Sequence, residues 1–259
     1  MINPHERVDD LQCGVDGKNF HIIQDPDNFC FGIDAVCLAN FAAGGTGLLG
    51  GTGPSGGGGG VRIKKGDKVL DLCTGTGIVP ILLCAKTNAG HITGLEIQPQ
   101  MAEMAERSVE MNGLCERIQI DCGDLKDGAS IYPANHFDVI TVNPPYIAFN
   151  GGVLNENKNK AIARHEIACN LTDIVALSSR LLKTGGKLFM VHRPNRLVDV
   201  LCTLRGVRLE PKVLQFVQSG LNEPSLVLIE AVDHGNSGIK VLQNIDPGTV
   251  TTWGYYPRT

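Results

Sequence analysis

The 259-residue sequence lacks the features that would place it in a membrane, outside the cell or around a metal ion. No run approaches the 18 apolar residues of a membrane-spanning helix. The first residues hold no charged stretch followed by an apolar core, so we expect no secretory signal. The nine cysteines include no Cys-x-x-Cys pair and the seven histidines no metal-spaced pair, which predicts no metal site. These absences favour a cytoplasmic protein with reduced cysteines in its core.

The sequence is also modest in charge. Charged residues make up 19% of the chain and the mean hydropathy is +0.01, which excludes a wholly disordered protein. A net charge of −4 argues against a generic nucleic-acid coat. Residues 151–212 are the exception, because they hold 11 basic and 5 acidic residues. This segment is consistent either with solvated helix faces or with a local phosphate-binding surface.

One stretch is dominated by glycine. Residues 44–60 contain 11 glycines, and such a segment loses too much backbone entropy on ordering to pack well. We therefore expect a flexible loop without a catalytic role. It divides an N-terminal arm, residues 1–43, from a main body, residues 61–232, which is followed by a tail, residues 233–259, to which we assign no role. We assume a monomer.

The body alternates strands and helices. We expect helices at residues 78–87, 99–112, 171–182 and 197–205, and strands at residues 68–73, 91–97, 118–122, 137–143, 187–191, 212–218 and 226–232. This order predicts an α/β fold with a mostly parallel seven-stranded sheet, helices on both faces and a late antiparallel strand. Ligands of such sheets bind beyond the carboxyl ends of the strands.

Polar residues follow each of the first three strands. The first ends in a glycine loop, Asp71–Gly77, whose Gly75 and Gly77 allow a sharp turn and close ligand approach. Pro80 stands where a dinucleotide-binding loop would have a third glycine. Glu96 follows the second strand and can accept hydrogen bonds from ribose hydroxyls, or it is a surface charge at a helix start. Asp124 follows the third strand and can bind an adenine amino group, or it only caps a turn.

The strongest signal is Asn143-Pro144-Pro145-Tyr146, directly after the fourth strand. The two prolines fix the backbone and lack N–H groups. The Asn143 amide oxygen and the Pro144 carbonyl can both point at one amino group, and Tyr146 offers a flat face for stacking. The alternative, a rigid loop without chemistry, requires this pattern to stand at a strand end by chance.

Together these residues resemble the Rossmann-like methyltransferases that use S-adenosylmethionine, over about residues 20–232. The resemblance makes residues 61–232 the methyltransferase domain and Asn143, Pro144, Pro145 and Tyr146 the catalytic tetrapeptide. It implies a cofactor site formed by Phe31, Gly32, Asp34, Asp71, Thr74, Gly75, Gly77, Glu96, Ile97, Asp124, Leu125 and Asn143. Asp34 and Asp71 are expected near the methionine ammonium, and the arm is expected to pack on the cofactor.

The sequence is most similar to the bacterial tRNA(Val) adenine-N6 methyltransferases, which modify the purine beside the anticodon. Two more segments carry this likeness, residues 24–36 with Phe31-Gly-Ile-Asp34-Ala, and residues 161–166 with Arg164-His165-Glu166. The glycine tract is longer than such proteins usually have. The resemblance implies a tRNA partner, with Tyr146 and His165 at the flipped base. Phosphates of the anticodon arm would meet basic residues, namely Lys158, Lys160, Arg164, Arg193 and Arg196.

Other functions share part of this pattern. Protein methyltransferases that modify release-factor glutamines use the same tetrapeptide, although they usually carry a helical domain ahead of the catalytic body. DNA adenine and ribosomal guanine-N2 methyltransferases also share it. A non-catalytic nucleotide-binding module or a nicotinamide oxidoreductase is a further alternative, against which Pro80 and the intact tetrapeptide both argue.

Overall fold

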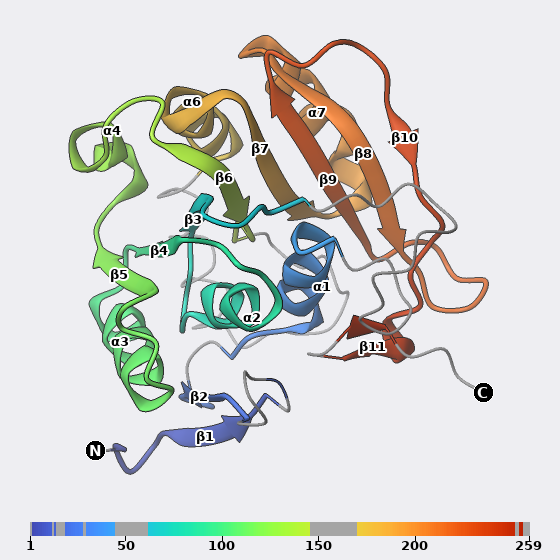
Figure 1. Cartoon of the computed structure of the whole chain (residues 1–259). Coiled ribbons are helices and arrows are strands. Elements are labelled where there is room, and N and C mark those ends of the chain that lie inside the picture. The colour runs from blue at the N-terminus through green and yellow to red at the C-terminus, as the bar shows by residue number, and fades with distance from the viewer. Residues whose placement is uncertain are drawn as a thin grey trace.

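The computed structural model describes residues 2–11, 13, 19–27, 30–44, 62–145, 170–251 and 254–255. Its centre is an eight-stranded sheet in the order β10-β8-β9-β7-β6-β3-β4-β5 (Figure 1). Strand β9 runs antiparallel to both neighbours, and the other pairings in this sheet are parallel. The strands are β3 (Lys68–Leu72), β4 (His91–Glu96), β5 (Ile118–Cys122), β6 (Phe137–Val142), β7 (Leu182–His192), β8 (Leu209–Val217), β9 (Leu226–Asp233) and β10 (Lys240–Val241).

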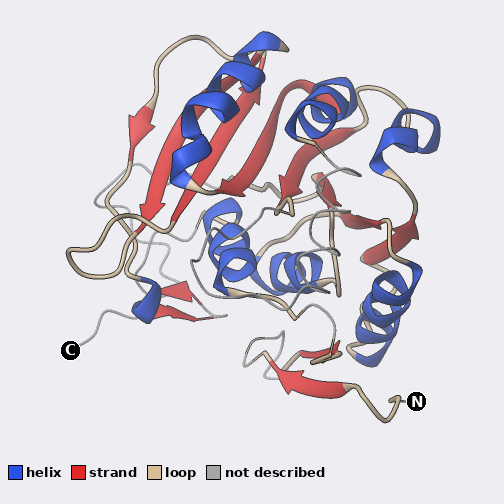
Figure 2. Ribbon diagram, turned by 180° about the vertical axis from the view of Figure 1, so that it is seen from behind, coloured by secondary structure: helices blue, strands red, loops and turns tan. Residues whose placement is uncertain are grey.

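Helices cover both faces of this sheet (Figure 2). One face carries α1 (Ile33–Ala42), α2 (Ile78–Lys86) and α3 (Pro99–Met111), and the other carries α4 (Gly128–Ile131), α6 (Leu171–Leu181) and α7 (Leu197–Gly206). Neighbouring strand residues point to opposite faces, so Val69 joins the core under α1 and α2 while Leu70 joins the core under α6. The predicted α/β sheet covered on two sides is confirmed.

The arm begins with a hairpin that lies on α3. Strands β1 (Arg7–Asp10) and β2 (His21–Gln24) pair antiparallel. The backbone N–H of Ile23 donates to Ser108 Oγ at 3.0 Å, and Arg107 Nη1 donates to Glu6 Oε2 at 2.8 Å. This hydrogen bond to Arg107 is the main reason that the pKa of Glu6 falls to about 2. The hairpin is therefore fixed to the body by buried and charged contacts.

Helix α1, which the sequence analysis did not predict, connects the arm to the sheet. It is apolar on nearly all sides and buried from Ala35 to Ala42, as expected for a helix packed between other elements. The Arg62 guanidinium lies 4.1 Å from the centre of the Phe41 ring and donates to the Phe41 carbonyl at 2.7 Å. Arg62 also pairs with the buried Glu230 of β9 at 3.4 Å. This ion pair ties the end of α1 to the sheet.

The residues after Val232 extend the sheet. Strand β10 pairs with β8, and beyond it the Ile245 N–H donates to the Phe216 carbonyl at 2.8 Å. A short hairpin of β11 (Val250–Thr251) and β12 (Gly254–Tyr255) follows, with Val250 against the core under α1. The sheet therefore has eight strands where seven were predicted, because β10 forms through pairing with β8 rather than through a strong strand pattern of its own.

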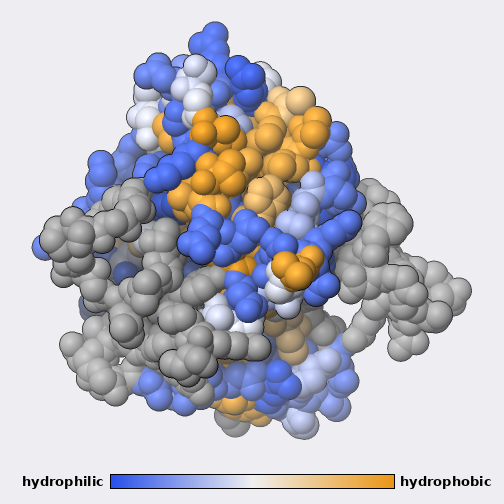
Figure 3. Space-filling model, turned by 90° about the vertical axis from the view of Figure 1, so that its right-hand side faces the viewer, coloured by the Kyte–Doolittle hydropathy of each residue, from blue (hydrophilic) through white to orange (hydrophobic). Residues whose placement is uncertain are grey.

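The side of the molecule that carries β10 mixes apolar and polar residues (Figure 3). Ile239 and Val241 are both among the exposed apolar residues. The remaining described elements are the 3-10 helices η1 (Leu125–Asp127), η2 (Pro194–Arg196) and η3 (Pro247–Thr249). Within the described ranges, no helix is long and apolar enough to cross a membrane.

Candidate active site

The candidate site lies where β3, β4, β5 and β6 end side by side. Leu72 at the end of β3 pairs with Leu95 of β4 and with Val142 of β6. Glu96 at the end of β4 pairs with Cys122 of β5. The four loops that follow these strands are therefore neighbours at one edge of the sheet, as the topology rule predicts.

The loop after β3 turns through three residues with positive φ. These are Cys73 at 58°, Gly75 at 58° and Gly77 at 84°. A Cβ added to Gly75 would meet no atom within 4 Å, so open space lies beside its backbone. A Cβ added to Gly77 would stand 3.1 Å from the Ala105 side chain of α3. Gly75 therefore leaves room for a ligand, while Gly77 allows α2 and α3 to pack closely.

Glu96 holds this glycine loop in place. One carboxylate oxygen accepts the Gly75 N–H and the other accepts the Gln98 N–H, each at 2.9 Å. The residue is only 4% exposed, so the interpretation as a surface helix-start charge is wrong. The Glu96 carbonyl also accepts the Gly123 N–H at 2.9 Å, which joins the β4 and β5 loops. The neighbouring Ile97 is 39% exposed beside them.

Asp71 lies inside β3 and its carboxylate is satisfied by two hydroxyl groups. Thr74 Oγ1 and Thr141 Oγ1 donate to its two oxygens, each at 2.6 Å. The side chain is 1% exposed, and this burial raises the pKa of Asp71 to about 7 although both hydrogen bonds oppose the rise. Asp71 thus positions Thr74 in the glycine loop, and its contact with a ligand stays a prediction.

The β5 loop is organised by Asp124. Its carboxylate accepts the Lys126 N–H at 2.9 Å and so caps η1, which is the turn-capping role considered above. The Leu125 side chain is buried in the core under α6. Adenine binding by Asp124 and Leu125 stays a prediction.

Asn143 directly follows β6, beside the glycine loop. Its Oδ1 is buried and has no hydrogen-bond partner among the residues that the structure describes. Pro144 is buried and Pro145 is half-buried. A buried acceptor without a donor costs free energy, so this atom is suited to receive a hydrogen from a ligand. Tyr146 lies outside the described residues.

The arm contributes the start of α1. The Phe31 N–H donates to the buried Gln24 side chain at 2.9 Å, and the Phe31 ring packs against the core. Gly32 precedes the helix, where a Cβ would stand 2.7 Å from an Asp34 carboxylate oxygen. A side chain at position 32 would displace the Asp34 carboxylate, and the contact of Gly32 and Asp34 with a cofactor stays a prediction.

The predicted substrate residues are only partly described. Arg193 directly follows β7, the strand next to β6, and so lies at the same edge as Asn143. Its Nη1 donates to the Ser225 carbonyl at 3.1 Å. Arg196 pairs with Asp199 at 2.7 Å. Lys158, Lys160, Arg164 and His165 lie outside the described residues.

Two residues of this region were missed by sequence reasoning. Thr141 supplies one of the two hydroxyls on Asp71, and its signal was a polar residue inside the apolar strand FDVITV. His192 at the end of β7 is buried, and its Nδ1 accepts the Arg193 N–H at 2.8 Å. This hydrogen bond leaves Nε2 as the protonated nitrogen of a neutral ring.

The sequence is similar to known methyltransferases. A family model described as a methyltransferase domain matches residues 69–156. The tRNA1(Val) (adenine(37)-N6)-methyltransferase of Porphyromonas gingivalis is 30% identical over 60% of this chain and 58% of that protein. The protein of the same name from Mannheimia succiniciproducens is 26% identical over 69% of this chain and 64% of that protein. The chain thus spans less than two thirds of the length of these two relatives.

A solved structure shows the same fold. A predicted O-methyltransferase from Agrobacterium tumefaciens superimposes with a TM-score of 0.59 at 18% identity, covering 82% of this chain and 86% of that protein. Residues 69–156 are thus similar to a methyltransferase domain, and the solved structure supports the fold of the chain.

Proposed function

We propose that this chain is an S-adenosylmethionine-dependent methyltransferase that methylates N6 of adenine in tRNA. The observation that carries the proposal is the buried Oδ1 of Asn143 beside the glycine loop, which has no hydrogen-bond partner within the described part of the chain. An acceptor in this position suits an amino group that must be held next to a methyl donor. The names of the curated relatives support adenine in valine tRNA as the target.

The residues at the strand ends fit the proposed cofactor. The open space beside Gly75 admits a ligand close to the backbone, and the buried Glu96 carboxylate would accept hydrogen bonds from ribose hydroxyls. Asp34 and Asp71 would face the ammonium group, and Ile97, Asp124 and Leu125 the adenine. When bound, S-adenosylmethionine supplies an electrophilic methyl group on its sulfonium sulfur.

The chain's own residues would act on the amine. The nitrogen of an adenine amino group is a poor nucleophile because its lone pair is delocalised into the ring. Asn143 Oδ1 and the Pro144 carbonyl would accept its two hydrogens, favour a pyramidal nitrogen and stabilise the positive charge that develops on it. Tyr146 would stack on the flipped base, and Arg193 would contact a phosphate from the neighbouring strand end.

A methyl-transfer assay tests this proposal. Undermodified tRNA, ribosomal RNA, DNA and a release factor are each offered with labelled S-adenosylmethionine, and the labelled product is identified by mass spectrometry. We expect N6-methyladenosine in valine tRNA. Asn143→Ala should lower turnover by about 100-fold or more, as for the loss of one transition-state hydrogen bond, while S-adenosylhomocysteine still binds.

The matched control is Asn236→Ala, because Asn236 is exposed and follows β9 at the opposite end of the sheet. It should leave turnover unchanged. Label only in the release factor, ribosomal RNA or DNA would overturn the tRNA assignment. Loss of S-adenosylhomocysteine affinity in Asn143→Ala would move Asn143 from catalysis to cofactor binding.

A further inference from the structure

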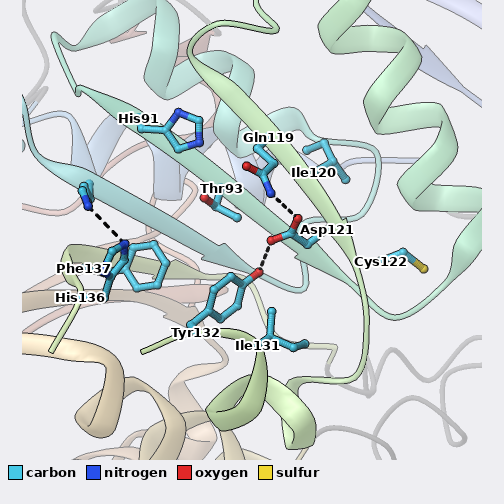
Figure 4. A pocket seen from close by; sticks show the side chains of 11 residues that line it. His91, Thr93, Gln119, Ile120, Asp121, Cys122, Ile131, Tyr132, His136 and Phe137 are labelled. Atoms are coloured by element: carbon cyan, nitrogen blue, oxygen red, sulfur yellow. Dashed lines mark hydrogen bonds between the residues drawn. The ribbon is translucent and has the colours of Figure 1, made fainter. Parts of the chain in front are cut away.

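A polar groove lies on the sheet, away from the strand ends described above. It is a groove of about 700 Å³ on the outer face of β4 and β5, between these strands and the segment from α4 to the start of β6 (Figure 4). The candidate active site uses the loops at the carboxyl ends of the strands. The groove instead uses side chains that stand along the strands themselves.

The sequence of these two strands is unusual for a parallel sheet. Strands buried on both faces are normally apolar throughout, yet here polar and apolar residues alternate. Ile92, Ile118 and Ile120 point to the core under α2 and α3. The opposite face carries His91 and Thr93 from β4 and Gln119 and Asp121 from β5. Nearer the centre of the sheet, the same face is apolar again, with Leu70 and Leu95 in the core.

One end of the groove is rich in basic nitrogens. Lys68 pairs with His91 across β3 and β4, and Lys68 Nζ lies 3.3 Å from His136 Nε2. Burial, together with the positive charges of Lys68 and Lys183, holds the pKa of His136 below its ordinary value. A neutral His136 ring accepts one Lys68 N–H at Nε2, and the Lys68 ammonium keeps two further N–H donors and its positive charge for an anion. This end of the groove suits a phosphate group.

The other end offers hydrogen-bonding groups beside aromatic rings. Gln119 Nε2 and the Tyr132 hydroxyl each donate to the Asp121 carboxylate at 2.7 Å. These bonds leave the Gln119 carbonyl as an acceptor, and Thr93 contributes a hydroxyl between the two ends (Figure 4). Tyr132 and Phe137 meet edge to face, with ring centres 5.4 Å apart. Amide, hydroxyl and ring edges together suit a flat polar heterocycle.

The two ends are separated by the length of a small ligand. Gln119 stands level with Thr93, two residues beyond His91, and lies two strands away from Lys68, which corresponds to about 7 Å along the strands and about 10 Å across them. Asp121 stands two residues further. A phosphate at Lys68 would therefore be joined to a heterocycle at Gln119 and Tyr132 through one sugar ring. We propose that the β4–β5 groove binds a mononucleotide unit, with its phosphate at Lys68 and its base at Gln119.

Calorimetry on the full chain tests the groove. AMP, inorganic phosphate and a short single-stranded oligoribonucleotide are titrated separately. Saturating S-adenosylhomocysteine is present throughout, so that the candidate active site does not take up adenine. Lys68→Ala should lower the affinities for AMP and for phosphate about tenfold, since one charge-assisted hydrogen bond is lost. Gln119→Ala should lower the affinity for AMP but leave the affinity for phosphate unchanged. Both side chains are exposed, and melting curves confirm that the variants fold.

The matched control is Lys212→Ala, because Lys212 lies on β8 at the other side of the sheet and donates to the Asn236 carbonyl. Weakened AMP binding in both groove variants, with the control unchanged, supports a site for free mononucleotides. If both groove variants bind only the oligoribonucleotide more weakly, with the control unchanged, the groove binds a nucleotide within an RNA chain. Two results would overturn the proposal. One is an AMP affinity that is the same in wild type, Lys68→Ala and Gln119→Ala. The other is a Gln119→Ala variant that loses as much affinity for phosphate as for AMP. These outcomes do not depend on methyl transfer.

Discussion

The strand-end site and the β4–β5 groove both gather polar side chains on one sheet, but they satisfy them in different ways. At the strand ends, Asp71 and Glu96 are buried, and their partners are hydroxyls and backbone N–H groups. In the groove, Asp121 is half-buried and its partners are the side chains of Gln119 and Tyr132. The buried contacts at the strand ends hold the glycine loop through Thr74 and the Gly75 N–H, whereas the groove contacts join side chains that stand on one face of the sheet. Changes at the strand ends should therefore alter both stability and cofactor affinity, and changes in the groove neither.

The largest effect is expected for Asp71→Asn, measured as the pH dependence of the unfolding free energy. Because folding raises the pKa of Asp71 from 3.8 to about 7, the folded state holds this proton more tightly than the unfolded state. The proton on Asp71 therefore contributes fully to the unfolding free energy below about pH 4, and this contribution is lost as the pH rises through 7. One pH unit of difference in pKa corresponds to about 1.4 kcal/mol, so the loss is on the order of 4 kcal/mol.

Urea unfolding at pH values from 4 to 8 measures this effect as the difference between wild type and Asp71→Asn. The asparagine variant should lack this decline and gain stability relative to wild type as the pH rises. Asp199→Asn is the matched control because the Asp199 side chain is 60% exposed, and it should keep the decline. Parallel curves for wild type and Asp71→Asn would contradict the buried, proton-binding role of Asp71.

A second large effect is expected for Glu96→Ala on cofactor affinity. The variant loses the acceptor that holds Gly75 and, in our proposal, the partner of the ribose hydroxyls. Hydrogen bonds to a charged group contribute about 2 kcal/mol, so the affinity for S-adenosylhomocysteine should fall about 30-fold. Calorimetry measures this, with Glu103→Ala as control, since the Glu103 side chain is 60% exposed on α3. Equal affinity in wild type and Glu96→Ala would remove Glu96 from the cofactor site.

Two glycine variants separate the shaping of the loop from its contact with ligand. Gly77→Ala meets both a left-handed backbone and the Ala105 side chain at 3.1 Å, so it should lower stability by about 2 kcal/mol. Gly75→Ala carries only the backbone cost of about 1 kcal/mol, but its methyl group enters the open space. Gly75→Ala should therefore lose more S-adenosylhomocysteine affinity per unit of lost stability. Urea unfolding and calorimetry give both quantities, and the reverse order would contradict the assignment.

Most of the body could be predicted from the sequence. From β3 to β6 the predicted elements end within one residue of the observed ones, because short apolar runs are bounded by glycine, proline or polar residues. Helix α1 was missed because IDAVCLANFA is apolar all round and shows no helical period. Strand β7 begins at Leu182 instead of residue 187, since pairing of Leu182 with Phe137 extends it. Such pairings depend on tertiary contacts that local patterns do not contain.

The candidate site was predictable where a motif stands at a strand end. Gly75, Glu96 and Asn143 are neighbours in the structure because the parallel register aligns the ends of β3, β4 and β6. The position of Asp71 was not predictable, because its partner Thr141 is 70 residues away and depends on the register of β3 against β6. The groove has no motif, since its residues come from four strands, α4 and the loop that follows α4. Alternation along β4 and β5 was its only signal in the sequence.

The smallest effect is expected for Asp121→Asn, and this variant is the sharpest test of the contrast between the two regions. Asparagine keeps an acceptor for the Tyr132 hydroxyl and loses one charge at a half-buried position. The unfolding free energy should therefore change by less than about 1 kcal/mol, and S-adenosylhomocysteine affinity should stay within about twofold. The two quantities are measured by urea unfolding and calorimetry, with Asp199→Asn again as the exposed control. A tenfold loss of S-adenosylhomocysteine affinity would show that the groove and the strand ends act as one site, because the Asp121 carboxylate would then support the β5 loop that follows it.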